Sequence, residues 1–223
     1  MATDAPVPMP TEEQALILAQ WFSPAYPVGG FAYSHGLEQA VHAGRVSCGE
    51  SLADWLTDVL SHGSGQSDAR FLAAAGRAAD ATALHEVETM CRAFAPSRER
   101  LLETRLQGAA FCDVTSRVWG LDLADLSYPV AVGQAARLLG LPLALTARLY
   151  LLAFAGNLVS AAQRLLPLGQ GAAQEILHRL HPLIGEIAER ASGQGLEGLS
   201  SIAILGDICA MQHEIQEPRI FRT

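Results

Sequence analysis

The longest apolar segment of the chain runs from Leu141 to Leu166 and limits what the rest of the chain can fold into. Arg148, Asn157 and Arg164 interrupt it. A membrane-spanning helix needs ~20 predominantly apolar residues, and the stretch between the two arginines is shorter than that. The segment therefore predicts a central helix that is buried on all sides in a helical protein, not a membrane span.

Helix signals recur along the whole chain, whereas alternating runs of β-branched residues are nearly absent. Thr11 and the segment 47–50 have the sequence patterns of helix starts. Asp80 and Ser97 are further candidate N-caps, and Pro129 suits the first turn of a helix. The pattern predicts an all-α protein, a single-domain helical bundle of about eight to ten helices.

Three regions are expected along the chain. Residues 1–10 are rich in proline and predict a disordered lead-in. Residues 11–216 form the all-α domain, and residues 217–223 form a C-terminal tail that docks to a partner. The lead-in has no positive charge and no apolar core, so a secretory signal is not expected and the predicted compartment is the cytoplasm.

Composition excludes several classes of function. The formal net charge of -8 argues against nucleic acid and against an anionic membrane surface as partners. All 15 basic residues are arginine, and without lysine neither a P-loop nucleotidase nor a Schiff-base enzyme can operate. The four cysteines contain no CxxC pair and are expected to be reduced and buried.

The segment from Ser23 to Glu38 combines two prolines, paired glycines and the aromatic residues Tyr26, Phe31 and Tyr33. Proline and glycine impose a non-helical path there, and aromatic side chains are costly to leave in water. Two interpretations stay open: a structural loop packed under the bundle, or a surface that binds a partner.

Three histidines are candidate metal ligands. His178 and His181 share one helical face, but no further ligand has the spacing to complete a site, so solvated side chains are favoured. His213 ends the last predicted helix, where it can interact with the helix dipole or make a transient metal contact. No hydrolase motif was found, and no catalytic residue or cofactor is predicted.

The end of the chain has the composition of a binding segment. Pro218 stops the last helix, and Arg219, Ile220, Phe221 and Arg222 follow it. Arginine and aromatic side chains are common binding hot spots, which favours a segment held by a partner. The alternative is that Ile220 and Phe221 pack back onto the chain itself.

Three segments together resemble the urease accessory protein F family. They are 23–38, the central run Asn157-Leu158-Val159-Ser160-Ala161-Ala162-Gln163-Arg164-Leu165-Leu166-Pro167-Leu168-Gly169-Gln170, and the ending Met211-Gln212-His213-Glu214 through Arg219-Ile220-Phe221-Arg222-Thr223. The resemblance spans residues 16–223 in order. The departures are mild: Pro218, Ile215 and Thr223 stand where the family usually has other residues, and His35 occupies a position often taken by another polar residue.

The resemblance implies a non-enzymatic, all-α accessory protein for nickel insertion into urease. It would bridge a scaffold accessory protein of the D or H type to a G-type GTPase, act on the urease apoprotein, form homodimers and modulate the GTPase. The partner-binding residues carried over from the motifs are Tyr26, Phe31, Tyr33, Arg164, Gln170, Arg219, Ile220, Phe221 and Arg222. The alternatives are a metallochaperone that carries nickel itself through His213, and an uncharacterised helical hydrolase.

Overall fold

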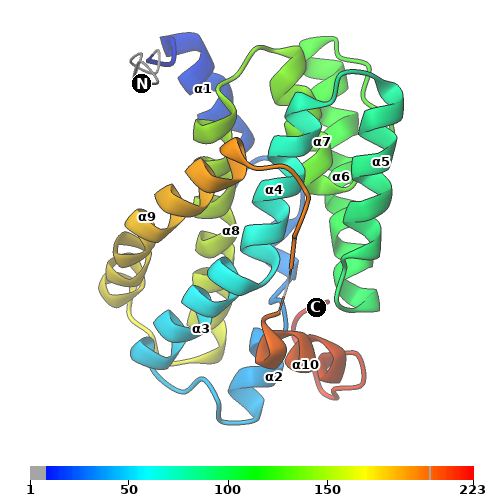
Figure 1. The fold of residues 1–223 in the computed structure, drawn as a ribbon. Coiled ribbons are helices and arrows are strands. Elements are labelled where there is room, and N and C mark those ends of the chain that lie inside the picture. Colours follow the sequence, from blue (N-terminus) through cyan, green and yellow to red (C-terminus); the bar gives the residue numbers. More distant parts are fainter. Residues whose placement is uncertain (1–8, 201) are drawn as a thin grey trace.

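The computed structural model describes residues 9–200 and 202–223, and within them the chain is all-α, as predicted. Ten α-helices and one short 3-10 helix are described, and no strand (Figure 1). In chain order they are α1 (Glu12–Trp21), η1 (Gly30–Ala32), α2 (Leu37–His42), α3 (Gly49–His62), α4 (Ser64–Arg77), α5 (Ala81–Ala93), α6 (Arg98–Trp119), α7 (Tyr128–Leu138), α8 (Leu143–Leu165), α9 (Gln170–Gly193) and α10 (Ile204–His213). Most of the predicted lead-in, residues 1–8, lies outside the described residues.

Most helix starts lie where the sequence predicts them. Thr11 forms a capping box at α1, and the side chains of Asp80 and Ser97 accept main-chain N–H groups at α5 and α6. The capping box predicted over residues 47–50 lies one residue further toward the C-terminus, over residues 48–51. Cys48 is the N-cap of α3, and the hydroxyl of Ser51 accepts its N–H at 3.1 Å.

The helix at the centre of the bundle is α4, not the apolar segment 141–166. In Figure 1, α4 lies between α5, α6 and α7 on one side and α3, α8 and α9 on the other. Small residues bring α4 and α7 together: a Cβ on Gly133 would lie only 2.1 Å from the main-chain oxygen of Leu72. An internal ion pair joins Asp68 of α4 to Arg100 of α6 at 2.6 Å, so polar residues of α4 are also satisfied inside the protein.

The apolar segment forms α8, which is less buried than expected. By length and composition α8 could cross a membrane. Only 39% of its most apolar stretch is buried inside the protein. Its buried positions face α9 and α4, while Arg148 and Arg164 are exposed. The expectation of a helix buried on all sides is therefore wrong, because α8 lies at the side of the bundle.

The expectation that all four cysteines are buried is also wrong at one position. Cys91, Cys112 and Cys209 are buried, and Cys48 is exposed at the start of α3. There the hydrogen bond from Ser51 lowers the pKa of the Cys48 thiol.

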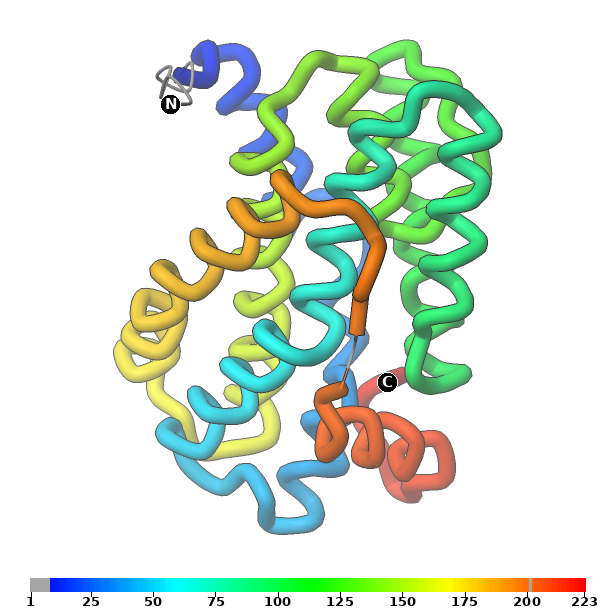
Figure 2. Tube along the Cα trace, viewed as in Figure 1, coloured from blue at the N-terminus to red at the C-terminus, as the bar shows by residue number. Residues whose placement is uncertain are grey.

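Helix α2 and the last helix, α10, lie together at the bottom of the bundle in Figure 1, whereas α1 lies at the top. Helix α2 packs against α10 through Gly36, whose φ of 75° suits glycine and whose added Cβ would lie 2.6 Å from the main-chain nitrogen of Ala210. The last residues of the chain then run beside the segment that leads into α2 (Figure 2). This arrangement brings sequence positions near 30 and near 220 into one region.

Candidate partner-docking site

The C-terminal tail, residues 217–223, folds back along the segment from Ala32 to Glu38. The N–H of Arg222 donates to the carbonyl oxygen of Ala32 at 2.9 Å. The N–H of Ser34 donates to a main-chain oxygen of Thr223 at 2.8 Å, and the Ser34 hydroxyl donates to the same atom. The tail is therefore paired with the main chain near α2 instead of extending from the bundle.

A buried carboxylate holds the middle of the tail. Glu38 is 5% exposed, and its Oε1 accepts the N–H of Ile220 at 2.7 Å while its Oε2 accepts the N–H of Phe221 at 2.9 Å. The Nε2 of His213 lies 3.1 Å from the same Oε2. This carboxylate thus accepts two main-chain N–H groups and also faces a ring nitrogen of His213, and these contacts offset the cost of its burial.

A second carboxylate, Glu99 on α6, completes this arrangement. Its Oε2 lies 2.8 Å from Nδ1 of His213, and its Oε1 accepts a guanidinium N–H of Arg219 at 2.5 Å. Both ring nitrogens of the fully buried His213 therefore face carboxylate oxygens.

Phe221 brings residues from all three sequence motifs together. Its ring is 3% exposed and lies under Arg164, whose Cζ is 4.2 Å from the ring centroid. Arg164 also donates to the carbonyl oxygen of Phe31 at 2.6 Å. Phe31, Arg164 and the tail are therefore neighbours, as a single docking site requires.

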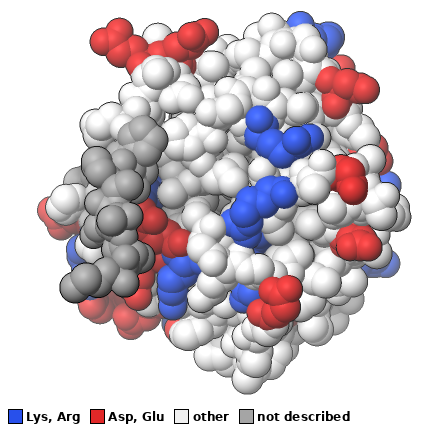
Figure 3. All heavy atoms as spheres, turned by 45° about the horizontal axis from the view of Figure 1, so that its top comes forward, with Lys and Arg blue, Asp and Glu red and all other residues white. Residues whose placement is uncertain are grey.

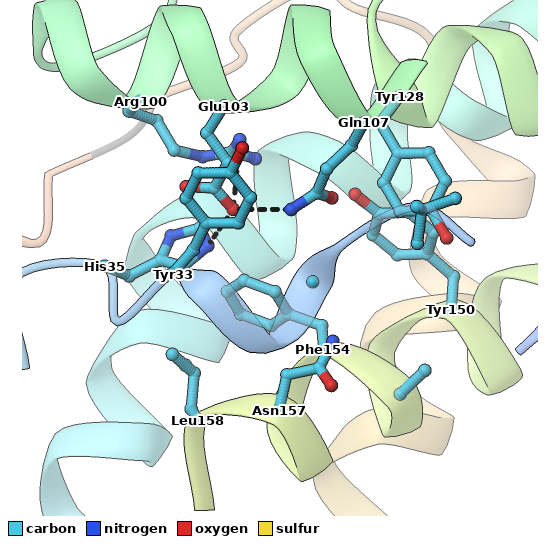
Figure 4. Close-up of a pocket in the computed structure, with 13 residues that line it drawn as sticks. Tyr33, His35, Arg100, Glu103, Gln107, Tyr128, Tyr150, Phe154, Asn157 and Leu158 are labelled. Atoms are coloured by element: carbon cyan, nitrogen blue, oxygen red, sulfur yellow. Dashed lines mark hydrogen bonds and ion pairs between the residues drawn. The ribbon is translucent and has the colours of Figure 1, made fainter. Parts of the chain in front are cut away.

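The end of the tail rests on a buried polar network (Figure 4). Glu103 of α6 accepts the hydroxyl of Thr223 at 3.2 Å and the side-chain amide of Gln107 at 3.0 Å, and it lies 2.8 Å from Nε2 of His35. Burial raises the pKa of Glu103, but His35 and Arg100 outweigh that effect and hold it below the ordinary glutamate value. The carboxylate is therefore the charged centre of this network.

Tyr33 lies beside that network and is buried, not presented to solvent. Burial and the neighbouring charge of Glu103 raise the pKa of its hydroxyl, and a hydrogen bond with Arg222 lowers it by less. Tyr33, His35 and Glu103 also line a cavity of about 30 Å³ that extends toward α7 and α8. A cavity of this size has room for only one or two waters.

The outer side of this region is apolar and exposed. Ile220 is 66% exposed, on the opposite side of the tail from Phe221. On α10 and the turn after it, exposed apolar residues recur at helical spacing and form what we call the α10 face: Ile204, Ile208, Met211 and Ile215. Exposed apolar groups that gather in this way mark interaction surfaces more often than single exposed residues do.

Two predicted partner residues lie outside this region. Tyr26 is buried, where its hydroxyl shares a 2.7 Å hydrogen bond with Thr115 and its ring packs against Phe111. Gln170 is exposed at the first turn of α9. Phe31, by contrast, is 68% exposed and accessible to a partner.

The histidines considered as metal ligands have different surroundings. His178 and His181 are exposed, with ring centroids 5.2 Å apart. His213 is enclosed between Glu38 and Glu99, so a metal could reach its nitrogens only after the tail had moved. Over residues 9–200 and 202–223, no group of three His, Cys, Asp or Glu side chains is placed to hold a metal ion.

Charges of both signs share the surface shown in Figure 3, where arginines gather near the middle and most acidic side chains lie toward the edge. Some arginines serve the fold: Arg70 donates to the carbonyl oxygens of Gly195 and Glu197, and Arg77 to those of Ser192 and Gln194. These guanidinium groups hold the end of α9 and the segment that follows it.

Sequence reasoning missed the residues that receive the tail, namely Ser34, Glu38, Glu99 and Glu103. Ser34 and Glu38 stand inside the 23–38 motif, but a pattern of residue types does not reveal that their partners are main-chain groups some 180 positions away. Glu99 and Glu103 belong to a stretch of mixed charge, and such a pattern is typical of a helix face that is exposed to solvent.

Comparison with known proteins identifies the family of the chain. A family model described as UreF matches residues 46–181. The chain is 56% identical over 214 residues to a urease accessory protein UreF of Ruegeria pomeroyi, covering 96% of this chain and 99% of that protein. It is 49% identical to the one of Roseobacter denitrificans, covering 93% of both chains, and 45% identical to the one of Bradyrhizobium diazoefficiens, covering 92% of this chain and 90% of that protein.

Proposed function

Since this chain belongs to the UreF family of urease accessory proteins, we propose that it is a non-enzymatic bridge in urease maturation. It joins a D- or H-type scaffold accessory protein to a G-type GTPase while nickel is inserted into the urease apoprotein in the cytoplasm. The observation that carries this proposal is the folded-back tail, which leaves an apolar side chain and two arginines on the outside of a well-held segment.

The scaffold protein docks on the outer side of the tail and on the α10 face. Ile220 and Met211 supply exposed apolar surface, and Arg219 and Arg222 supply forked donors for carboxylates or carbonyls. Because the tail is already ordered by its own hydrogen bonds, docking costs less conformational entropy than capture of a free segment. Phe221 acts indirectly by holding the tail in place.

The 23–34 segment is part of a partner surface that contacts the GTPase or a second copy of the chain. Phe31 is the exposed aromatic residue of that segment and lies beside Arg164, which makes it the direct contact. Tyr26 and Tyr33 are buried and support the segment from inside. An arginine of this chain that reaches the GTPase would modulate its activity by adding positive charge near the phosphates.

The test is a reconstitution of the purified chain with its D/H-type scaffold and its G-type GTPase, analysed by size exclusion with light scattering. The wild-type chain should form a dimer on its own and a complex that contains all three proteins. Ile220→Asp should lose the scaffold, because a carboxylate in a buried apolar contact is desolvated without a partner. Phe31→Ala should keep the scaffold and lose the GTPase.

A matched control is Leu138→Asp, which puts the same charge at an exposed apolar position on α7. It should leave the three-protein complex unchanged. If Ile220→Asp binds the scaffold as tightly as Leu138→Asp does, the tail and the α10 face are not the docking surface.

A further inference from the structure

We infer that a cavity between α4 and the end of α9 is a binding site for a small tetrahedral oxyanion such as phosphate. The segment that follows α9 runs beside α4 in Figure 1, and hydrogen bonds from Arg70 to Gly195 and Glu197 hold it there. The cavity that remains has a volume of about 110 Å³. Its lining consists of Gln66, Arg70, Ile187, Arg190, Ala191 and Gln194.

Each of the two helices brings one arginine and one glutamine to the cavity, four positions apart. On α4 they are Gln66 and Arg70, and on α9 they are Arg190 and Gln194, the residue at which that helix ends. Residues at this spacing lie on the same side of a helix. Guanidinium and amide donors therefore come from both helices. Donors from several directions suit a tetrahedral anion, whereas one forked guanidinium already satisfies a planar carboxylate.

The positive charge of the cavity is not balanced by acidic side chains. Among the residues that the structure describes, none of those that line the cavity is acidic. Another arginine beside α9 does have such a partner, since Arg148 forms an ion pair with Glu189 at 2.6 Å. Within the described part of the chain, no ion pair includes Arg70 or Arg190. Two guanidinium groups at one cavity favour a doubly charged anion.

The burial of Arg70 makes this imbalance costly. The residue is only 7% exposed. Its guanidinium donates to the carbonyl oxygens of Gly195 and Glu197, which carry partial negative charge and no full charge. A buried cation without a counter-charge is destabilising. An oxyanion in the cavity supplies that counter-charge.

The main-chain carbonyl groups at the end of α9 oppose an anion, because the helix dipole is negative there. Arg77 offsets this effect: it donates to the carbonyl oxygens of Ser192 at 2.6 Å and of Gln194 at 2.5 Å. The end of α9 is thus surrounded by three arginines, Arg70, Arg77 and Arg190. An anion that binds only the folded chain raises its stability.

The test is a titration of the full-length chain with sodium phosphate at constant ionic strength and slightly alkaline pH, where phosphate is mostly doubly charged. Binding is followed by NMR of the main-chain amides of Gln194 and Gly195 and by the melting temperature. Both amide signals should shift and saturate, with half-saturation at about 1 mM phosphate or below, and the melting temperature should rise. Sodium acetate should leave both signals nearly unchanged. The measurement needs no protein partner, so it stands apart from the docking test.

Variants of the lining assign the effect to this cavity. Arg190→Gln removes one charge at an exposed position and should weaken phosphate binding at least about tenfold, as expected for loss of hydrogen bonds to a charged group. Arg105→Gln, at an exposed arginine on α6, makes the same change of net charge outside the cavity. It is the matched control and should bind phosphate as the wild type does.

Gln66→Glu places a carboxylate in the cavity itself. It should abolish phosphate binding and raise the melting temperature of the phosphate-free chain, because the new carboxylate supplies the counter-charge. The site is wrong if the amides of Gln194 and Gly195 do not shift with phosphate up to about 10 mM. Equal weakening by Arg105→Gln and Arg190→Gln would assign binding to net charge and overturn it. Equal shifts with acetate would contradict the tetrahedral anion.

Discussion

Replacing Phe221 with alanine should release the tail while the helices stay folded. Burial of a phenylalanine side chain contributes about 2–3 kcal/mol, and a cation–π contact such as that with Arg164 adds about 0.5–1 kcal/mol. The loss of about 3 kcal/mol corresponds to a roughly 100-fold larger population of the released tail. The loss is local, because the tail packs on the 32–38 segment and the surface of the bundle, not between the central helices.

Limited trypsin digestion followed by intact-mass measurement reports the population of molecules in which the tail is released. The chain has no lysine, so trypsin can cut only after arginine, and a cut at the Arg219–Ile220 bond removes the end of the tail. Cleavage from a briefly open state follows the open population when opening and closing are fast. Phe221→Ala should therefore be cut at this bond roughly 100 times faster than the wild type, with a nearly unchanged melting temperature.

Ile220→Ala is the matched control, since it shortens a neighbouring apolar side chain that is exposed. In this variant the tail should stay bound to the bundle. The rate of cleavage at the Arg219–Ile220 bond should change by less than about threefold, as for most surface substitutions. If Phe221→Ala is cut no faster than Ile220→Ala, then the buried ring does not hold the tail and the reasoning from burial fails.

Three further outcomes follow from individual contacts. Tyr26→Phe should lower the free energy of unfolding by about 1 kcal/mol in urea denaturation, because it removes the hydroxyl that is hydrogen-bonded to Thr115. Glu103 has a lowered pKa, so its stabilising effect is complete above the ordinary glutamate value of 4.5 and is lost as the pH falls further. Melting temperatures should accordingly fall more steeply with acid in the wild type than in Glu103→Gln, and parallel curves would contradict this assignment. Gly36→Ala should cost about 1–3 kcal/mol from its positive φ alone, and its added methyl group collides with Ala210, so amide exchange in α10 should accelerate.

The sequence predicts the helical class and most helix starts, because both depend on local signals. The central helix could not be predicted in this way. Helix α4 is rich in alanine and carries Asp68 and Arg70, so its composition resembles a surface helix more than a core helix. Its burial depends on contacts with distant residues, namely the close approach of Gly133 and the ion pair with Arg100. The more apolar α8 lies at the side of the bundle.

The sequence motifs identify the segments of the candidate site but not their arrangement. Phe31, Arg164 and Phe221 belong to three separate motifs, and the structure places them side by side. Aromatic residues on a proline and glycine frame can point inward or outward, so the buried Tyr26 and the exposed Phe31 could not be told apart. Glu38 was inside a recognised motif, yet its role depends on main-chain donors that no residue pattern records.

The most direct test of the proposed function is the nickel content of urease purified from cells in which this chain has been deleted and then restored. We expect little nickel per urease active site without the chain and full occupancy with the wild-type chain. Occupancy should stay low with Ile220→Asp and be full with Leu138→Asp, both expressed at equal level. Full nickel occupancy in cells that lack the chain would contradict a role in urease maturation, and full occupancy with Ile220→Asp would contradict docking through the tail.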